Sequence, residues 1–376
     1  MQILHIITGL GDGGAEAVLY RMCKFDKEFK HTVISLSGQE KYVNMLKTLN
    51  ISVHPLDFSN KAINLYGLYK LYKLIRKIKP DVVQTWMQHA DLIGGTIARL
   101  AGIKNIFWGV HYAFLIREHD KKINTLIYRI NIILSHILPK KIIYCAYEAK
   151  KAQEKNGFCK RKGLVIQNGY DYDNFIKDRS AGLNFRNEIG VDDDVFLIGH
   201  VGRYDPNKDL TNLICAISLL NKSIHKFKVV LVGTGLDNNN SLLLSSLHDY
   251  KVSDFVYLLG RRNDIPAVMN GIDLFALSSK SEAFPNVLNE SMLCCTPCVT
   301  TDVGDAGHIV GSHGWVVKPE NPILLADSIL KAMDEKNKKT ILWQNRRDNC
   351  RERIVQNYSL HKMVSSYKKE WLEVLK

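Results

Sequence analysis

Two glutamates in the second half of the chain have a spacing that could do chemistry. Glu282 and Glu290 lie eight residues apart in "SEAFPNVLNE", with Pro285 at the predicted start of a helix. Glu282 then precedes the helix, and Glu290 falls in its second turn. Two such carboxylates could bind different parts of a polyhydroxylated ligand, beside backbone N–H groups that the helix start leaves unpaired. Taken alone, either glutamate is more typical of a solvated helix face.

Two cations follow a predicted strand in "GHVGRYDPNKD". Arg203 comes directly after the strand, and Lys208 lies five residues later, where the next helix should begin. Arginine can bind a phosphate bidentately and lysine acts as a point charge, so the pair suits a diphosphate. The segment has no G-K-[ST] sequence, which excludes a P-loop.

The first turn of the chain has the letters of a dinucleotide fingerprint. Gly9, Gly11 and Gly14 match G-x-G-x-x-G between the strand-like "QILHII" and the helical "AEAVLYRMCKF". A dinucleotide site also needs an acid at the end of the second strand. That strand, "HTVISLSG", ends in serines 35 and 37, which disfavours NAD. Gly13 and Gly14 could still let the backbone approach an anion at a helix start, or could serve packing alone.

The elements that position these residues alternate between strand-like and helical runs along the whole chain. Such alternation predicts an α/β protein with mainly parallel sheets. The pattern restarts at "VFLIGHVGR" after a turn-rich connector, so we predict two domains that divide near residues 165–190. The final segment, 360–376, is predicted to be a helix that crosses back to the first domain.

Composition is consistent with this organisation. A chain of 376 residues is too long for one ordinary core, and 46% apolar with 24% charged residues is typical of a globular protein. The chain opens on a strand pattern, so we expect no signal peptide, and no apolar run is long enough to span a bilayer. The eight cysteines lack zinc spacing and are expected to be buried, reduced thiols of a cytoplasmic protein.

The net charge of +13 indicates an anionic partner or an anionic surface. Residues 61–80 contain six Lys or Arg and no acid, and residues 121–141 again bracket apolar residues with lysines. On a helical wheel Lys70, Lys73 and Lys77 share one face, roughly opposite an apolar set: Leu65, Leu68, Tyr72 and Ile75. These are either core-packed helices with solvated basic faces or a footprint on an anionic membrane. No nucleic-acid-binding motif is present, so we expect no nucleic-acid partner.

Taken in order, the motifs "GGAE", "VIQNGYD", "GHVGR…NKD", "SEAFPNVLNE" and "TDVGDAGHIVGSHGWVV" resemble those of the retaining glycosyltransferases of family 4. The resemblance covers nearly the whole chain and is strongest from about 165 to 320. It implies the α/β GT-B fold, with two facing Rossmann-like domains and a central cleft. Residues 1–170, completed by helix 360–376, would form the acceptor side, and residues 190–355 the nucleotide-sugar donor side.

The resemblance also implies roles for individual residues. Glu282 would contact the transferred sugar, and His111, which ends the strand "FWGVH", would orient the sugar or acceptor unless it is a packed core histidine. These two are the predicted catalytic residues. Further residues would bind the donor. In order from the base through the ribose and diphosphate to the sugar, they are Arg262, Glu290, Arg203, Lys208, Gly13, Gly14, Ala283, Phe284 and Asn286.

The chain departs from the family pattern at three places. Ala283 replaces the glycine of E-G-F-P, "LCCTP" replaces Ala-Cys-Gly-x-Pro, and His308 stands where a glutamate is common. These departures bear on which sugar is used more than on the reaction. The "DYD" of Asp171 and Asp173 resembles a metal motif of other glycosyltransferases, but its place in the connector indicates a turn. We therefore expect no metal and no other cofactor.

The function that follows is metal-independent transfer of a hexose or N-acetylhexosamine, with retention, from a nucleotide sugar for which UDP is the expected carrier. The acceptor would be a glycan or a polyprenyl-diphosphate-linked sugar in capsule or lipopolysaccharide assembly, at the inner face of the cell membrane. Alternatives are a UDP-N-acetylglucosamine 2-epimerase, an NAD-dependent oxidoreductase, and a non-catalytic basic module that binds membrane or nucleic acid. The Glu-x7-Glu context argues against the epimerase, and the module would leave both cations and both glutamates without a purpose.

Overall fold

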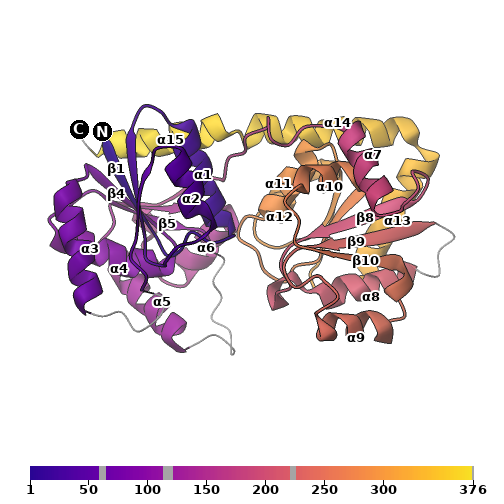
Figure 1. The fold of residues 1–376 in the computed structure, drawn as a ribbon, viewed down its shortest axis with the longest axis horizontal. Helices are drawn as coiled ribbons and strands as arrows, with labels where there is room; N and C mark the ends of the chain where they lie inside the picture. Colours follow the sequence, from indigo (N-terminus) through magenta and orange to yellow (C-terminus); the bar gives the residue numbers. More distant parts are fainter. Residues whose placement is uncertain (59–64, 113–121, 221–225, 375–376) are drawn as a thin grey trace. The chain divides into compact units, whose positions relative to one another are not determined.

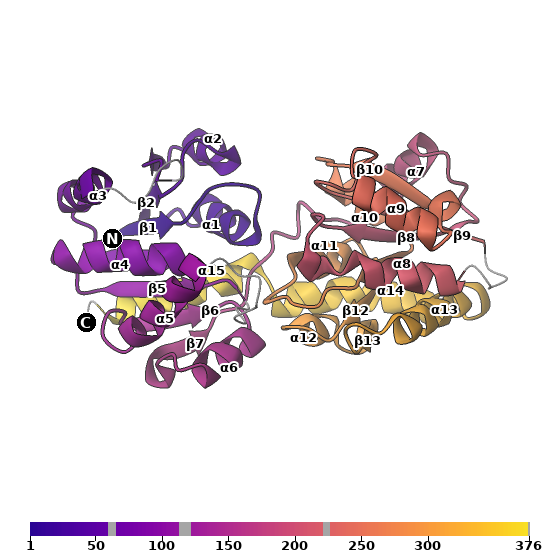
Figure 2. The same ribbon diagram turned by 90° about the horizontal axis from the view of Figure 1, so that it is seen from below.

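The computed structural model describes residues 1–58, 65–112, 122–220 and 226–374. Its internal contacts divide the chain into two compact units: unit 1 comprises Met1–Tyr170 with Leu360–Lys376, and unit 2 comprises Asp171–Ser359. Each unit is a parallel sheet with helices against both faces (Figures 1 and 2). Unit 1 is therefore built from the two ends of the sequence.

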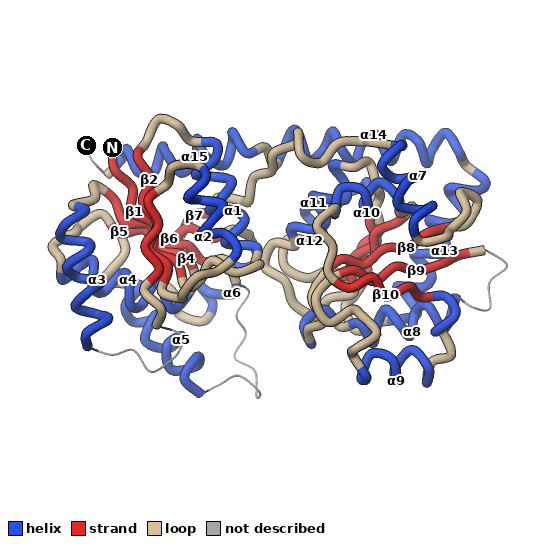
Figure 3. The backbone as a smooth tube through the Cα atoms, in the orientation of Figure 1, coloured by secondary structure: helices blue, strands red, loops and turns tan. Residues whose placement is uncertain are grey.

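Unit 1 contains a seven-stranded sheet in the order β3-β2-β1-β4-β5-β6-β7, and every described pairing is parallel. Figure 3 shows the strands in red. Its strands are β1 (Gln2–Ile7), β2 (Lys30–Ser35), β3 (Ser52–Pro55), β4 (Val82–Trp86), β5 (Ile106–Val110), β6 (Lys141–Tyr144) and β7 (Gly163–Val165). Its helices are α1 (Gly14–Phe25), α2 (Lys41–Thr48), α3 (Leu65–Ile78), α4 (Gln88–Leu100), α5 (Lys122–Ser135), α6 (Tyr147–Lys155) and α15 (Leu360–Glu373).

The two faces of this sheet bury different helices. Helices α1, α2 and α15 pack on one face, around Val18, Leu46 and Trp371. Helices α3, α4 and α5 pack on the other, around Ile75 and Tyr128. Because both faces are covered, the strands are continuous apolar runs such as "QILHII" rather than alternating ones. The helix that ends the sequence thus completes the core of unit 1.

Unit 2 contains a six-stranded parallel sheet in the order β10-β9-β8-β11-β12-β13. Its strands are β8 (Phe196–Val201), β9 (Phe227–Val232), β10 (Val256–Gly260), β11 (Leu274–Leu277), β12 (Cys298–Thr301) and β13 (Trp315–Val317). Its helices are α7 (Arg179–Glu188), α8 (Leu210–Leu220), α9 (Ser241–Asp249), α10 (Ile265–Gly271), α11 (Asn286–Leu293), α12 (Ala306–Val310), α13 (Pro322–Lys338) and α14 (Thr340–Asn357).

Local sequence explains where several of these helices begin. Asp178, Asn240 and Asn321 each accept a hydrogen bond from the backbone N–H three residues later, at the starts of α7, α9 and α13. Such caps satisfy a donor that the first helical turn leaves unpaired, each stabilising the helix by about 1 kcal/mol. The predicted turn role of the connector also has a structural basis, because Asp171 accepts hydrogen bonds from the Asp173 N–H (3.2 Å) and the Asn174 side chain (2.9 Å).

One predicted helix differs in its buried face. Residues 61–64 of the predicted basic helix lie outside the described residues, and α3 buries Gly67, Leu71 and Ile75. Leu65, which the helical wheel grouped with the apolar face, is 86% exposed. The wheel fails there because Leu65 is the first described residue of α3 and the buried stripe begins after it. The eight cysteines are free thiols, and seven of them are buried. No helix among the described residues is long and apolar enough to cross a membrane.

Candidate active site

Each sheet has one point where the strand order reverses, between β1 and β4 in unit 1 and between β8 and β11 in unit 2. Ligands of open α/β sheets bind beyond the carboxyl ends of the strands at such points, because the flanking loops diverge there. The predicted residues Gly13 and Gly14 follow β1, whereas Arg203 and Lys208 follow β8, and Glu282 follows β11. The sequence motifs therefore coincide with the two switch points.

Lys208 and Glu282 meet at the switch point of unit 2. The Lys208 ammonium donates to Glu282 Oε1 across 2.7 Å, and the two side chains are 19% and 15% exposed. The Ser279 hydroxyl donates to the same oxygen, also at 2.7 Å. Lys208 closes a short 3₁₀ turn (Pro206–Lys208), and α8 begins only at Leu210, two residues later than predicted. The sequence separation of 74 residues hid this ion pair from sequence analysis.

Backbone contacts from the segment after β12 fix the loop that carries Glu282. Asp305 donates its backbone N–H to the Ala283 carbonyl at 3.0 Å. Gly304, which precedes it, has a φ of +54°, and a Cβ there would lie 2.4 Å from the carbonyl oxygens of Glu282 and Ala283. Only glycine fits a position with both constraints. The "TDVGDAG" motif therefore acts as the support of the Glu282 loop.

Arg203 is the exposed cation of this site. Within the described part of the chain its side chain makes no ion pair, so it is available to an anion. Its turn is held by the neighbouring one, because Gly202 donates to the Val232 carbonyl and Tyr204 to that of Thr234. Gly233 has to be glycine, since a Cβ would lie 1.8 Å from the Gly202 oxygen. The structure thus positions the backbone of this cation before any ligand binds.

Helix α11 carries the other predicted donor contacts of this loop. Pro285 occupies the N-cap of α11 without a side-chain cap, as the sequence predicts, and Glu290 lies half-buried in the second turn. Phe284 is buried and packs edge-on against Tyr358 with ring centroids 5.6 Å apart. Its side chain therefore serves the core, which leaves its backbone for the predicted sugar contact.

Arg262 has a structural role that the sequence did not reveal. Its guanidinium pairs with both Glu188 oxygens (2.6 and 2.9 Å) and with Asp264, and lies 5.3 Å from the Phe185 ring centroid. These hydrogen bonds raise the pKa of Arg262 and lower those of Glu188 and Asp264. Since the side chain is already used, this arrangement is compatible with the prediction that the backbone near Arg261 and Arg262, rather than the guanidinium, would contact the base.

The glycine turn of unit 1 is held by an acid that sequence analysis missed. Glu40, at the N-cap of α2, accepts hydrogen bonds from the Leu10 N–H and from the Ser37 hydroxyl. A Cβ at Gly9 would lie 3.1 Å from the Glu40 carboxylate, so this glycine makes room for that group. Glu40 lies three residues after Ser37 in the sequence, where it serves the turn itself rather than a ligand. Gly13 has extended backbone at the N-cap of α1, with φ of −127°.

His111 is a half-buried residue that directly follows β5, and both nitrogens of its ring are buried. It stacks on Trp86 with centroids 4.9 Å apart, and neither ring nitrogen has a hydrogen-bond partner within the described residues. Burial lowers its pKa to about 4. Unpaired buried nitrogens are costly. The stacking matches the core interpretation, while the unused nitrogens leave a ligand role open to test.

Met87 marks the same switch point from the β4 side. It has a φ of +71°, an uncommon conformation for a residue other than glycine, at the N-cap of α4. Its N–H donates to the Gly109 carbonyl and its carbonyl accepts from Asp91, which hold the conformation in place. Such strain concentrates at functional sites, and nothing in the sequence marks it.

Comparisons with known proteins assign both units. The family model "Glycosyltransferase Family 4" matches residues 12–174, and the model "Glycosyl transferases group 1" matches residues 183–353. An Escherichia coli relative, UDP-Gal:alpha-D-GlcNAc-diphosphoundecaprenol alpha-1,3-galactosyltransferase, is 26% identical over 318 residues, which are 83% of this chain and 79% of that protein. The Staphylococcus aureus capsular polysaccharide biosynthesis glycosyltransferase CapM is 24% identical over 54% of each chain.

Solved structures agree on the fold. Anabaena HepE in complex with UDP-glucose superposes with a TM-score of 0.84 at 22% identity, over 100% of this chain and 99% of that one. WaaG, a glycosyltransferase involved in lipopolysaccharide biosynthesis, gives a TM-score of 0.72 at 15% identity, over 98% of each chain. Two parallel Rossmann-like units matched in this way confirm the predicted fold class. The chain therefore belongs to the GT-B glycosyltransferases, with a glycosyltransferase family 4 domain followed by a glycosyl transferases group 1 domain.

Proposed function

We propose that this glycosyltransferase transfers a hexose or N-acetylhexosamine from a UDP-sugar, with retention and without a metal ion. The observation that carries the proposal is the Lys208–Glu282 pair at the switch point of unit 2. Lys208 would turn to the diphosphate when the donor binds, which frees Glu282 for the hydroxyls of the sugar. Glu290 would bind the ribose hydroxyls, because the acid near the end of β2, Glu40, already accepts hydrogen bonds from the glycine turn.

The leaving diphosphate needs positive charge, and unit 2 supplies it from three sources. Arg203 is exposed, Lys208 is half-buried, and the N-terminus of α11 has no side-chain cap. Electrostatic stabilisation of this kind often makes the largest contribution to the rate of an enzyme. With these cations and N–H donors, departure of the diphosphate on the face that the acceptor attacks would require neither a metal nor an enzymic nucleophile.

The acceptor is proposed to be a sugar linked to a lipid diphosphate, in the assembly of a surface polysaccharide. The Escherichia coli relative carries such an acceptor in its name, and CapM belongs to capsule biosynthesis. The net charge of +13 and the lysines of α3 support association with an anionic membrane surface at the inner face of the cell membrane. Family membership also favours transfer over the epimerase and oxidoreductase alternatives.

Thermal unfolding with UDP, GDP, ADP or NAD, each with and without EDTA, tests the donor. A ligand at about a hundred times its dissociation constant should stabilise the binding unit by roughly 2.7 kcal/mol. We expect a shift with UDP that EDTA leaves unchanged. A shift that EDTA removes would refute metal independence, and stabilisation by NAD alone would overturn the proposal. Proton NMR of the product formed from a UDP-sugar panel would establish whether the anomeric configuration is retained.

A further inference from the structure

We propose that the pocket between β3 and α3 of unit 1 is an anion site, distinct from the diphosphate site of unit 2, and that it binds a phosphate group. The pocket has a volume of about 370 Å³, within the range of sites for small organic ligands. Its lining comes from two segments, residues 53–56 of β3 and its end, and Lys70, Lys73, Leu74 and Lys77 of α3. It lies at the edge strand of the sheet, separated from β1 by β2.

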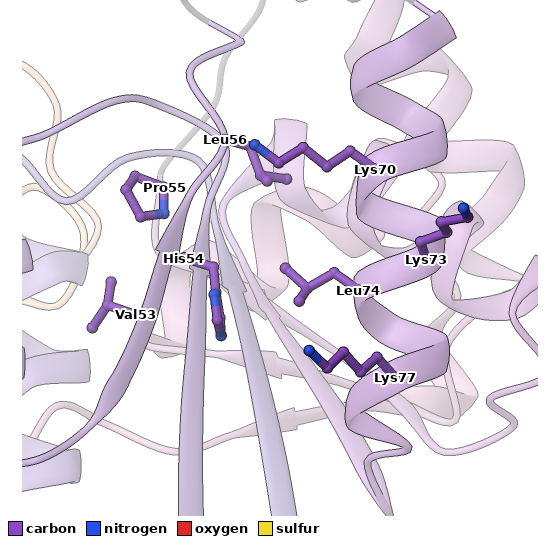
Figure 4. A pocket seen from close by; sticks show the side chains of 8 residues that line it. All are labelled: Val53, His54, Pro55, Leu56, Lys70, Lys73, Leu74 and Lys77. Atoms are coloured by element: carbon purple, nitrogen blue, oxygen red, sulfur yellow. The ribbon is translucent and has the colours of Figure 1, made fainter.

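The pocket is walled by cations on one side only. Figure 4 shows Lys70 and Lys77 extending from α3 toward β3, with Leu74 between them. The lysines follow each other at intervals of three and four residues, which places them on one side of a helix. None of the eight lining residues is acidic, and neither Lys70 nor Lys77 forms an ion pair within the described residues. An anion between these ammonium groups would relieve their mutual repulsion.

His54 gives the opposite wall a neutral hydrogen-bonding group. Its Nε2 lies 3.0 Å from the Ser52 hydroxyl, and its ring is half-buried. Burial lowers the pKa of His54, and the positive charge of Lys77 lowers it further. A neutral imidazole can donate one hydrogen bond to an anion without adding charge, and Leu56 and Leu74 provide an apolar floor for the group that carries the phosphate.

Exposed apolar residues beside the pocket point to a lipid as the source of the phosphate. Leu65, Tyr66 and Tyr69 precede Lys70 on α3 and are 86%, 75% and 53% exposed. Large aromatic and aliphatic side chains next to lysines are typical of helices that lie in a membrane interface. Lys73 stays with this set, because its ammonium lies 4.8 Å from the Tyr69 ring centroid. The phosphate site itself is thus independent of the proposed membrane association, and only the assignment of its ligand to a lipid depends on that proposal.

The test compares two charge-matched double variants of the full chain. Lys70→Gln with Lys77→Gln removes two pocket cations, whereas Arg76→Gln with Lys79→Gln removes two cations of the same segment that do not line the pocket. Glycerol phosphate is titrated while the His54 ring protons are followed by NMR, and sedimentation with phosphatidylcholine vesicles, with or without phosphatidylglycerol, measures lipid binding. We expect glycerol phosphate to cause saturable shifts of the His54 ring protons and to raise the pKa of His54. Both ligand-induced changes should be lost in the pocket variant alone. The pocket variant should also lose more vesicle binding than the control variant.

The arms separate the possible outcomes. Glycerol phosphate binding without a specific effect on vesicles would support the site and assign it to a soluble phosphate compound. Equal weakening of vesicle binding in both variants, with no shift of His54, would overturn the site in favour of diffuse surface charge. UDP affinity is measured in parallel and should be unchanged in both variants. Failure of the wild-type protein to bind UDP would refute the proposed donor while leaving the phosphate site standing.

Discussion

The charge of Lys208 is satisfied by the Glu282 carboxylate in the structure, and its proposed ligand is a diphosphate. Lys208→Ala should therefore weaken UDP binding by roughly 10- to 100-fold, since a hydrogen bond to a charged group contributes about 1.5–3 kcal/mol. Isothermal titration calorimetry measures the change.

The matched control for this charge is Lys226→Ala. Lys226 is 62% exposed and pairs with Asp194 at 3.1 Å, and it precedes β9, at the opposite end of the parallel strands from Lys208. Its loss should leave the affinity for UDP unchanged. Equal affinities of the Lys208 variant and the wild-type protein would rule out the phosphate role.

At the scale of elements, helix α9 ends at a strained residue. Lys251 has a φ of +57°, and it donates to the His248 carbonyl while Val252 donates to that of Leu247. This is the Schellman pattern, in which glycine is preferred because it has no Cβ. Lys251→Gly should stabilise unit 2 by up to about 1 kcal/mol.

Introducing glycine inside the helix should have the opposite effect on stability. Ser245 is exposed in the middle of α9, and Ser245→Gly should destabilise unit 2 by roughly half a kcal/mol because glycine is the more flexible in the unfolded chain. Urea unfolding of both variants checks the pair, and destabilisation by Lys251→Gly would contradict the assigned strain.

Helix α15 is predicted to contribute to unit 1 as a core element. Trp371 is fully buried, and its indole N–H donates to Gln84 Oε1 at 3.3 Å. Trp371→Ala should cost about 3–5 kcal/mol of unfolding free energy, because it leaves a cavity and an unpaired amide. Leu372→Ala, at a neighbouring residue that is 43% exposed, should cost far less. Denaturant unfolding measures the stability of the two variants. Similar losses of unfolding free energy would mean that α15 packs only loosely on unit 1.

The whole molecule should lose stability as the pH falls, because both units bury neutral histidines. Burial lowers the pKa of His111 in unit 1 and of His200 in unit 2 to about 4, and lowers that of His5 well below its usual value. Each group binds a proton in the unfolded chain below about pH 6.5 but resists protonation in the fold. The contribution of these histidines to the free energy of unfolding is therefore complete above pH 6.5. It falls toward pH 4 by up to about 1.4 kcal/mol per pH unit for each histidine.

The buried acid Asp91 acts in the opposite direction. Burial raises the pKa of Asp91 well above its usual value, so protonation of this carboxyl favours the folded state as the pH falls. A comparison of His200→Asn with the wild-type protein isolates one histidine from this background. Urea midpoints between about pH 7 and 4 should fall less steeply for the variant. Parallel pH profiles of the two proteins would show that His200 does not contribute the predicted part of the stability loss at low pH.

The sequence by itself determined the fold class and the motifs of the site. Buried parallel strands need continuous apolar runs and helices need a 3.6-residue period, so the alternation was legible without coordinates. The positions of Arg203, Lys208, Glu282 and Glu290 next to strand ends or a helix start followed from the same local rules. These features depend on neighbours in the sequence, and local propensities are what a sequence displays directly.

Tertiary structure alone decided which of these residues meet. The Lys208–Glu282 pair depends on β8 and β11 being adjacent in the sheet, and the use of Arg262 by Glu188 depends on the packing of α7 against α10. Glu40 turned out to hold the glycine turn because α2 begins beside it. Such contacts join residues tens of positions apart, and their geometry is set by strand order and helix packing rather than by local preference.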